Sequence, residues 1–210
     1  NWHVKVQFTV YTRNKLFGDG LAVWFTDTQI FKGNAMGGPN SWKGVAVFVD
    51  TYDNNKNRDN PLILGIVNDG KKVYEPNDDG LGISNGHCKY KEMQFKKDDS
   101  TLMDISLKDG SFHVSIGHEG HMVDCFTIDG VDIESPYLSF SANTGDLSEV
   151  VEIQSVEVLE EGGDQRRGAS ENVPQKGKKR QVIVPEDVLA TLGINEANLF
   201  DGVETEGEKI

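Results

Sequence analysis

The chain has 210 residues, a formal net charge of −13 and 37% hydrophobic residues. Nucleic-acid binding requires a basic face, so this charge excludes nucleic acid as an expected partner. No apolar run reaches the ~18 residues that a membrane-spanning helix needs, so membrane attachment is expected only through a segment not present in this chain.

The first two predicted strands differ in how they are buried. Residues 2–10 alternate apolar and polar positions, which predicts a half-buried strand. Residues 21–26 are apolar on both faces and predict a core strand. Asp19 stands just before this second strand, between Gly18 and Gly20, where two glycines let another backbone or a ligand approach closely. A plain turn is the alternative for this position.

The next strand ends in a group of oxygen-bearing residues. Residues 45–49 read as a buried strand, and Asp50, Tyr52 and Asn54 follow at intervals of two residues. A curling loop can aim the Asp50 carboxylate, the Tyr52 carbonyl and Asn54 at one centre, as Ca²⁺ requires. For such a loop taken alone, a solvated turn is the common alternative.

The same loop does not match an EF-hand. Counted from Asp53, that pattern would place Arg58 where a glycine is needed and Leu64 where the bidentate glutamate is needed. A calcium loop of another kind is therefore expected.

A second acidic loop follows a predicted hairpin. Residues 61–67 read as a strand, Asn68-Asp69-Gly70 as its turn, and residues 71–74 as the returning strand. The chain then reaches the acidic loop 75–80. A hairpin between two acidic loops can bring them together, and together they could complete a cation shell.

The remaining pattern is that of an all-β protein. Further strands are predicted at residues 101–107, 112–116, 122–128, 136–142 and 150–159, with turns at close intervals. These short strands predict an antiparallel β-sandwich. His113, His118 and His121 crowd one hairpin, but no cysteine or carboxylate lies at a recognisable ligand spacing beside them, which disfavours zinc.

Composition changes at Glu160. Residues 160–210 are mostly charged or small, with few aromatics, and cannot bury enough apolar surface to offset their ordering entropy. We expect a charged linker or stalk, largely disordered, with one possible short helix at residues 185–192. Its basic run, residues 176–180, is interpreted as a solvated spacer.

Cys88 and Cys125 are compatible with one disulfide or with two buried thiols, and composition leaves both open. A bridge would close a loop of about 38 residues and stabilise the fold by about 4 kcal/mol on the chain-entropy model. It would also indicate a secretory or extracellular compartment.

Four short motifs carry a family resemblance, in the family's order and with family-like separations. The first is residues 18–24, the second is residues 49–54 and the fourth is residues 144–148. The third combines residues 68–70, Tyr74 and residues 79–80. With the cysteine pair in its expected place, residues 1–159 resemble the L-type lectin family, specifically the leguminous-lectin-like lumenal domains of the ER-to-Golgi mannose-binding cargo receptors. The resemblance implies a legume-lectin (concanavalin-like jelly-roll) sandwich with a Cys88–Cys125 disulfide. It implies a non-enzymatic receptor for high-mannose N-glycans on secretory glycoproteins, on the lumenal side of a type I membrane protein of the ER, ERGIC and Golgi.

The resemblance also implies individual roles. Calcium would be held by Asp50, the Tyr52 carbonyl, Asn54 and Asp79, and would keep Asn54 oriented for the sugar. Asp79 is preferred to Asp78 because it precedes Gly80. Sugar contacts would come from Asp19, Asn54, Gly145, Asp146 and Leu147.

Two departures from the family pattern matter. Pro76 stands where the family has a histidine that contributes to the sugar site, and proline donates no hydrogen bond, so mannose binding is expected to be weakened or altered. Family domains also carry strands before the point that corresponds to Asn1. We therefore expect a fragment that lacks its N-terminal strands, with an oligomerising stalk and a membrane anchor possible after Ile210.

Two other functions can be weighed. Sandwich glycosidases use paired carboxylates that face one cleft. The acidic pairs in strands here, Glu149 with Glu152 and Glu152 with Glu157, are spaced by odd numbers and would point to opposite faces, which disfavours catalysis. A lectin fold that serves only protein interaction is favoured by Pro76, whereas Asp19, Asn54 and residues 145–147 favour a working lectin.

Overall fold

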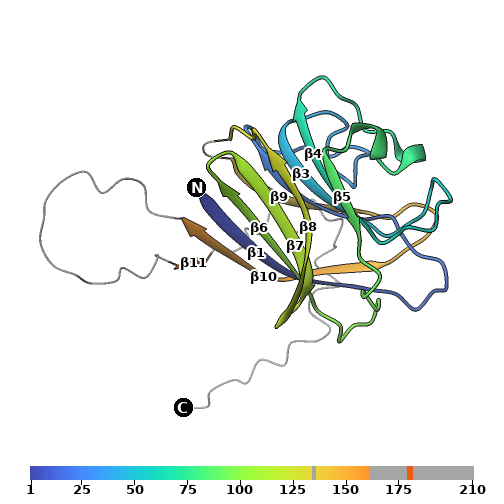
Figure 1. Ribbon diagram of the computed structural model, residues 1–210. Helices are drawn as coiled ribbons and strands as arrows, with labels where there is room; N and C mark the ends of the chain where they lie inside the picture. The colour runs from blue at the N-terminus through green and yellow to red at the C-terminus, as the bar shows by residue number, and fades with distance from the viewer. Residues whose placement is uncertain (134–135, 161–178, 182–210) are drawn as a thin grey trace, which may run out of the picture.

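The computed structural model describes residues 1–133, 136–160 and 179–181, which form a sandwich of two antiparallel sheets (Figure 1). The six-stranded sheet has the order β11-β10-β1-β6-β7-β8, with strands β1 (Trp2–Tyr11), β6 (Thr101–Lys108), β7 (Ser111–His118), β8 (His121–Asp129), β10 (Val150–Glu160) and β11 (Lys179–Gln181). The five-stranded sheet has the order β5-β4-β3-β2-β9, with β2 (Gly20–Thr26), β3 (Lys43–Asp50), β4 (Leu62–Asp69), β5 (Gly86–Lys89) and β9 (Tyr137–Asn143). Two 3-10 turns, η1 (Pro76–Asp78) and η2 (Leu81–Ile83), separate β4 from β5. The predicted all-β sandwich is confirmed.

The two sheets enclose the main core. Along β1, Val4, Val6, Phe8 and Val10 are buried and face the five-stranded sheet, as the period-2 alternation predicts. Every residue of β2 is buried, because its sheet is covered on both faces. On the face away from the main core, the Trp24 ring lies edge-on to Trp42 and Phe48 in a second apolar cluster.

Strand register brings the candidate site together. Gly20 of β2 pairs with Asp50 of β3 on one side and with Asn143 of β9 on the other, while Asp50 also pairs with Leu62 of β4. A side chain at position 20 would not fit, because its Cβ would lie 2.0 Å from the Val49 carbonyl oxygen. Since these residues form one row across four strands, the segments that adjoin them leave the sheet at the same end.

The predicted returning strand at residues 71–74 is wrong. The Asn68 carboxamide binds the backbone of Gly70 and Lys72 and so turns the chain away from β4. Tyr74 donates its backbone N–H to the Asn40 carbonyl, and its buried ring packs on Phe48. On the side of β4 away from β3, the pairing strand is instead β5, which the sequence analysis did not predict.

The disulfide between Cys88 and Cys125 is confirmed, with Cα atoms 5.2 Å apart. Cys88 lies on β5 and Cys125 on β8, which are edge strands of different sheets. The bridge therefore joins the two layers along one side of the sandwich.

The segment expected to be a linker contains one strand within the described residues. β11 pairs antiparallel with residues 157–159 of β10 and includes part of the basic run. The predicted helix at residues 185–192 lies outside the described residues, and so does most of the predicted linker. Within the ranges that are described, no helix has the length and apolar character needed to cross a membrane.

Candidate functional site

The loop after β3 is organised around Asp50. The Asp50 side chain is 1% exposed, and its Oδ1 accepts hydrogen bonds from the Tyr52 N–H (3.0 Å) and from Asn60 Nδ2 (2.9 Å). Asn60 Nδ2 also donates to the Tyr52 carbonyl, at 2.9 Å. Asp50 Oδ2 is buried without a hydrogen-bond partner. Asn60, which the sequence analysis missed, therefore holds two of the predicted ligands in place.

The second acidic loop contributes Asp79. This residue follows η1 in a left-handed backbone conformation, and its side chain is fully buried. Its two carboxylate oxygens accept hydrogen bonds from the backbone N–H groups of Asn54 (3.1 Å) and Asn55 (3.3 Å). The oxygens of Asp78 instead accept from Gly80 and Gly82 in its own loop. Asp79 is thus the residue of this pair that faces the first loop.

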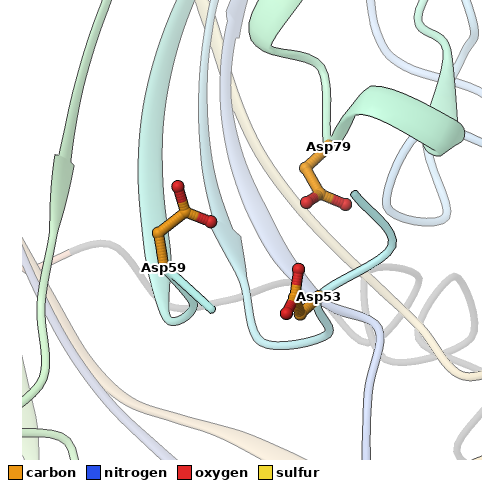
Figure 2. Close-up of side chains that lie close together, drawn as sticks. All are labelled: Asp53, Asp59 and Asp79. Carbon is orange, nitrogen blue, oxygen red and sulfur yellow. The ribbon is translucent and has the colours of Figure 1, made fainter. Parts of the chain in front are cut away.

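Three carboxylates converge in these loops, and the predicted ligand Asp50 is not one of them. Figure 2 shows Asp53, Asp59 and Asp79 facing a common centre, each with an oxygen within 4.8 Å of the others. Asp53 Oδ1 and Asp59 Oδ1 are buried without hydrogen-bond partners, although Lys89 Nζ lies 3.5 Å from Asp59 Oδ2. Across the described part of the chain, no other group of three acidic, histidine or cysteine side chains is close enough to hold a metal ion.

Sequence reasoning did not identify Asp53 and Asp59 as ligands. The available signal was the density of oxygen-bearing residues in the loop 50–60, which continues past Asn54. Motif matching tested Asp53 only as the start of an EF-hand. It could not show that the loop folds back and brings Asp59 to Asp53 and Asp79.

Burial and the repulsion of neighbouring carboxylates destabilise the charged forms of Asp50 and Asp79. Burial, with the neighbouring charge of Asp79, raises the pKa of Asp50 to about 9. Burial also raises the pKa values of Asp79 and Asp19. Desolvated carboxylates with unpartnered oxygens are the donor set that a hard divalent cation such as Ca²⁺ prefers, so the residues present fit the predicted metal.

The predicted sugar-contacting residues lie at the same end of the sheet. The Asp19 N–H donates to the Asn143 carbonyl (3.0 Å), and Asp19 Oδ2 accepts from Asn143 Nδ2 (2.7 Å). Thr51 in the loop 50–60 donates its N–H to the Asp19 carbonyl, at 3.1 Å. A Cβ atom on Gly145 would lie 3.6 Å from Asp19 Oδ2. The structure therefore brings Asp19, Gly145 and the loop 50–60 together.

The other predicted contacts remain accessible. Asn54 and Asp146 are exposed and Leu147 is half-buried, while Pro76 is exposed at the start of η1. A ligand could reach all four from solvent, but their mutual distances are set by loops rather than by strand pairing.

The histidines of the β7–β8 hairpin have separate partners. His113 Nδ1 lies 2.9 Å from Thr127 Oγ1, His118 Nδ1 lies 3.0 Å from the Ser100 carbonyl, and His121 Nε2 lies 3.8 Å from Glu92. This arrangement adds no support for zinc.

Comparison with known proteins identifies relatives of the same architecture. The chain is 38% identical to protein ERGIC-53 of Chlorocebus aethiops over 88 residues, which are 42% of this chain and 17% of ERGIC-53. It is 29% identical to the vesicular integral-membrane protein VIP36 of Mus musculus over 168 residues, covering 76% of this chain and 46% of VIP36. The chain thus spans less than half the length of either relative.

Solved structures agree. The Ca²⁺-bound form of the VIP36 exoplasmic/lumenal domain superposes with a TM-score of 0.72 at 29% identity, covering 78% of this chain and 70% of that domain. Its Ca²⁺/Man3GlcNAc-bound form superposes equally well, with a TM-score of 0.72 at 28% identity, covering 79% and 72%.

The model of the legume-like lectin family matches residues 1–165, which include every described strand except β11 and all the residues of the candidate site. The resemblance inferred from the four short segments is therefore confirmed, and this chain belongs to the legume-like lectin family.

Proposed function

We propose that this chain is a calcium-dependent lectin for high-mannose N-glycans, and that the protein acts without catalysis as a glycoprotein cargo receptor between the ER and the Golgi. The observation that carries the proposal is the convergence at one end of the sandwich. Asp19, the Gly145 loop and the loop 50–60 meet there, and the loop 50–60 also carries Asp53 and Asp59 of the carboxylate group. The VIP36 domain, which has the same fold, has been crystallised with Ca²⁺ and Man3GlcNAc.

The chemistry of these groups suits a sugar. The Asp19 carboxylate is held by Asn143 and can accept hydrogen bonds from vicinal hydroxyls, while the exposed Asn54 carboxamide can both donate and accept. Gly145 has no side chain, so a ring can approach the backbone beside Asp19.

Calcium would be held by Asp50, the Tyr52 carbonyl, Asn54 and Asp79, with Asp53 and Asp59 beside them. When bound, it would neutralise the buried carboxylates and fix the loop that carries Asn54. Asp79 already links the two loops through its hydrogen bonds to Asn54 and Asn55, so its loss should affect metal and sugar together.

A lectin fold that serves protein interaction is the second candidate. It is favoured by Pro76, which is exposed at the start of η1 and offers a ligand no hydrogen-bond donor. In that case the calcium site would persist as a structural element while glycan binding is lost.

The deciding experiment measures binding of the full chain to immobilised high-mannose glycan in calcium and in chelator, with calcium binding followed by calorimetry. We expect binding that is lost in chelator, and a loss of at least about tenfold in both calcium and glycan affinity for Asp79→Asn. Asp69→Asn is the matched control, because Asp69 is exposed at the opposite end of β4.

Two outcomes would reject parts of the proposal. Calcium binding without glycan binding would favour the protein-interaction alternative. Glycan binding that persists in chelator would refute calcium dependence.

A further inference from the structure

The loop that carries three of the predicted sugar contacts joins strands of different sheets. Residues 144–149 lead from β9 in the five-stranded sheet to β10 in the six-stranded sheet. Such a loop is not closed by hydrogen bonds between its flanking strands, as a hairpin loop is. The position of Gly145, Asp146 and Leu147 therefore depends on how the two ends of the loop are held.

The first end of the loop is held at Asp19. Asn143, the last residue of β9, accepts the Asp19 N–H through its carbonyl (3.0 Å) and donates from its side chain to Asp19 Oδ2 (2.7 Å). Asn143 also pairs with Gly20 in the sheet. This end is therefore fixed by strand pairing as well as by a side-chain hydrogen bond.

The second end of the loop is held by Glu149. Its Oε2 accepts the Thr51 hydroxyl at 2.8 Å, and Thr51 donates its backbone N–H to the Asp19 carbonyl at 3.1 Å. Both side chains are buried, with exposed fractions of 9% for Glu149 and 7% for Thr51. The second end is thus linked to the same residue as the first.

The hydrogen bond between Thr51 and Glu149 differs from the other contacts at this end because it is buried. Ser148 accepts hydrogen bonds from Thr12 (3.3 Å) and Asn14 (3.4 Å), but both contacts are exposed, so water can replace them. The second carboxyl oxygen of Glu149, Oε1, is buried without a hydrogen-bond partner in the described part of the chain. Loss of the Thr51 hydroxyl would therefore leave a buried carboxyl group unsatisfied, which is costly.

We propose that Glu149 is a positioning residue for the proposed sugar site. Through Thr51 it ties the second end of the loop to Asp19, while Asn143 ties the first. The contacts close a circuit that begins and ends at Asp19, and residues 145–147 are held beside it. This inference rests on the proposed function, since it assigns Glu149 a role in glycan binding.

Substitutions on each side of the buried hydrogen bond test the proposal, with glycan binding by the full chain measured in saturating calcium. Thr51→Val and Glu149→Ala should each weaken glycan affinity by about three- to tenfold, the effect of one hydrogen bond. The double variant should lose no more than the weaker-binding single variant, because both changes remove the same contact. Thr51→Ser keeps the hydroxyl and should bind within about twofold of the parent.

A second measurement does not depend on the glycan. NMR order parameters of the amides in residues 145–147, recorded in calcium without glycan, should fall in Thr51→Val and Glu149→Ala toward the value of about 0.6 or below that marks flexible backbone. Thr26→Val is the matched control, because Thr26 is a buried threonine at the other end of β2 whose hydroxyl donates to the Thr28 carbonyl. The control should change neither the glycan affinity nor these order parameters.

Two results would overturn the proposal. The first is equal order parameters for residues 145–147 in the parent, Thr51→Val and Glu149→Ala. The second is a parent that binds glycan while the losses of the two single variants are absent or add up in the double variant. A parent that binds no glycan rejects the proposed function instead, and the order parameters alone then decide whether Glu149 anchors the loop.

Discussion

Pro76 begins the 3-10 turn that positions Asp79. Its carbonyl accepts the Asp79 N–H at 3.1 Å, and its fixed φ suits the first position of a helical turn. In the proposed sugar site, the same residue would offer the ligand no hydrogen-bond donor. Its effect on the fold and its expected effect on the ligand therefore run in opposite directions.

Replacing this proline tests its effect on the sugar. Pro76→His should raise mannose affinity by about three- to tenfold, the gain from one added hydrogen bond, measured by glycan titration in calcium. Pro76→Ala is the control, because it removes the ring without adding a side-chain donor. Equal affinities of the His and Ala variants would refute the role assigned to this position.

Glu149 is a second residue whose environment has a measurable consequence. It is 9% exposed, and its Oε2 accepts the Thr51 hydroxyl at 2.8 Å while its Oε1 is buried without a partner. Burial raises the pKa of Glu149 from 4.5 to about 7. The folded state therefore holds this proton more tightly than the unfolded state.

Because the folded-state pKa of Glu149 is raised, its contribution to the free energy of unfolding falls as pH rises from about 4.5 to about 7. Glutamine does not titrate, so Glu149→Gln should not show this decrease. The variant should be more stable than the parent by about 2–3 kcal/mol at pH 8, and similarly stable near pH 4.5. Urea unfolding across pH 4.5–8 measures the free energy of unfolding of parent and variant. Glu119→Gln is the control, because Glu119 is exposed. Parallel pH profiles for parent and Glu149→Gln would contradict the assignment.

At the scale of elements, β5 depends on the disulfide. It has four residues and pairs only with β4 in the described sheet, and Cys88 ties it to β8 of the other sheet. The bond spans 37 positions of sequence and closes one side of the sandwich.

Removing this cross-link should destabilise the domain. Cys88→Ser with Cys125→Ser should lower the free energy of unfolding by about 2–5 kcal/mol, because the unfolded chain regains loop entropy. Urea unfolding with and without reductant measures the effect. Reductant should shift the parent toward the variant and leave the variant unchanged, and a parent insensitive to full reduction would disprove the contribution.

At the scale of the whole molecule, the candidate site is assembled by the sandwich rather than by any one loop. The hydrogen bond between Asp19 and Asn143 spans 124 positions, and that between Asn54 and Asp79 spans 25. The row that Leu62, Asp50, Gly20 and Asn143 form across the sheet holds these segments at one end. Unfolding of the edge strand β9 would therefore remove Asn143, the partner of Asp19, from the candidate site.

Local pattern was sufficient for most of the fold. The alternation in β1 and the double-sided apolar run in β2 predicted their strands, because side-chain period reports which faces are buried. It failed at residues 71–74, where the Asn68 carboxamide and burial of Tyr74 outweighed a strong hairpin signal. The resemblance supplied the cysteine pairing that composition left open.

The sequence by itself determined the class of fold, the loop after β3 as a calcium candidate, and the positions of Asp19 and Gly145 as sugar candidates. Only the tertiary structure decided that Asn60 holds Asp50, that Asp53 and Asp59 join Asp79, and that Asn143 orients Asp19. The physical reason is that local sequence encodes periodicity and turns. Contacts between distant segments depend instead on strand register, which the packing of both sheets sets together.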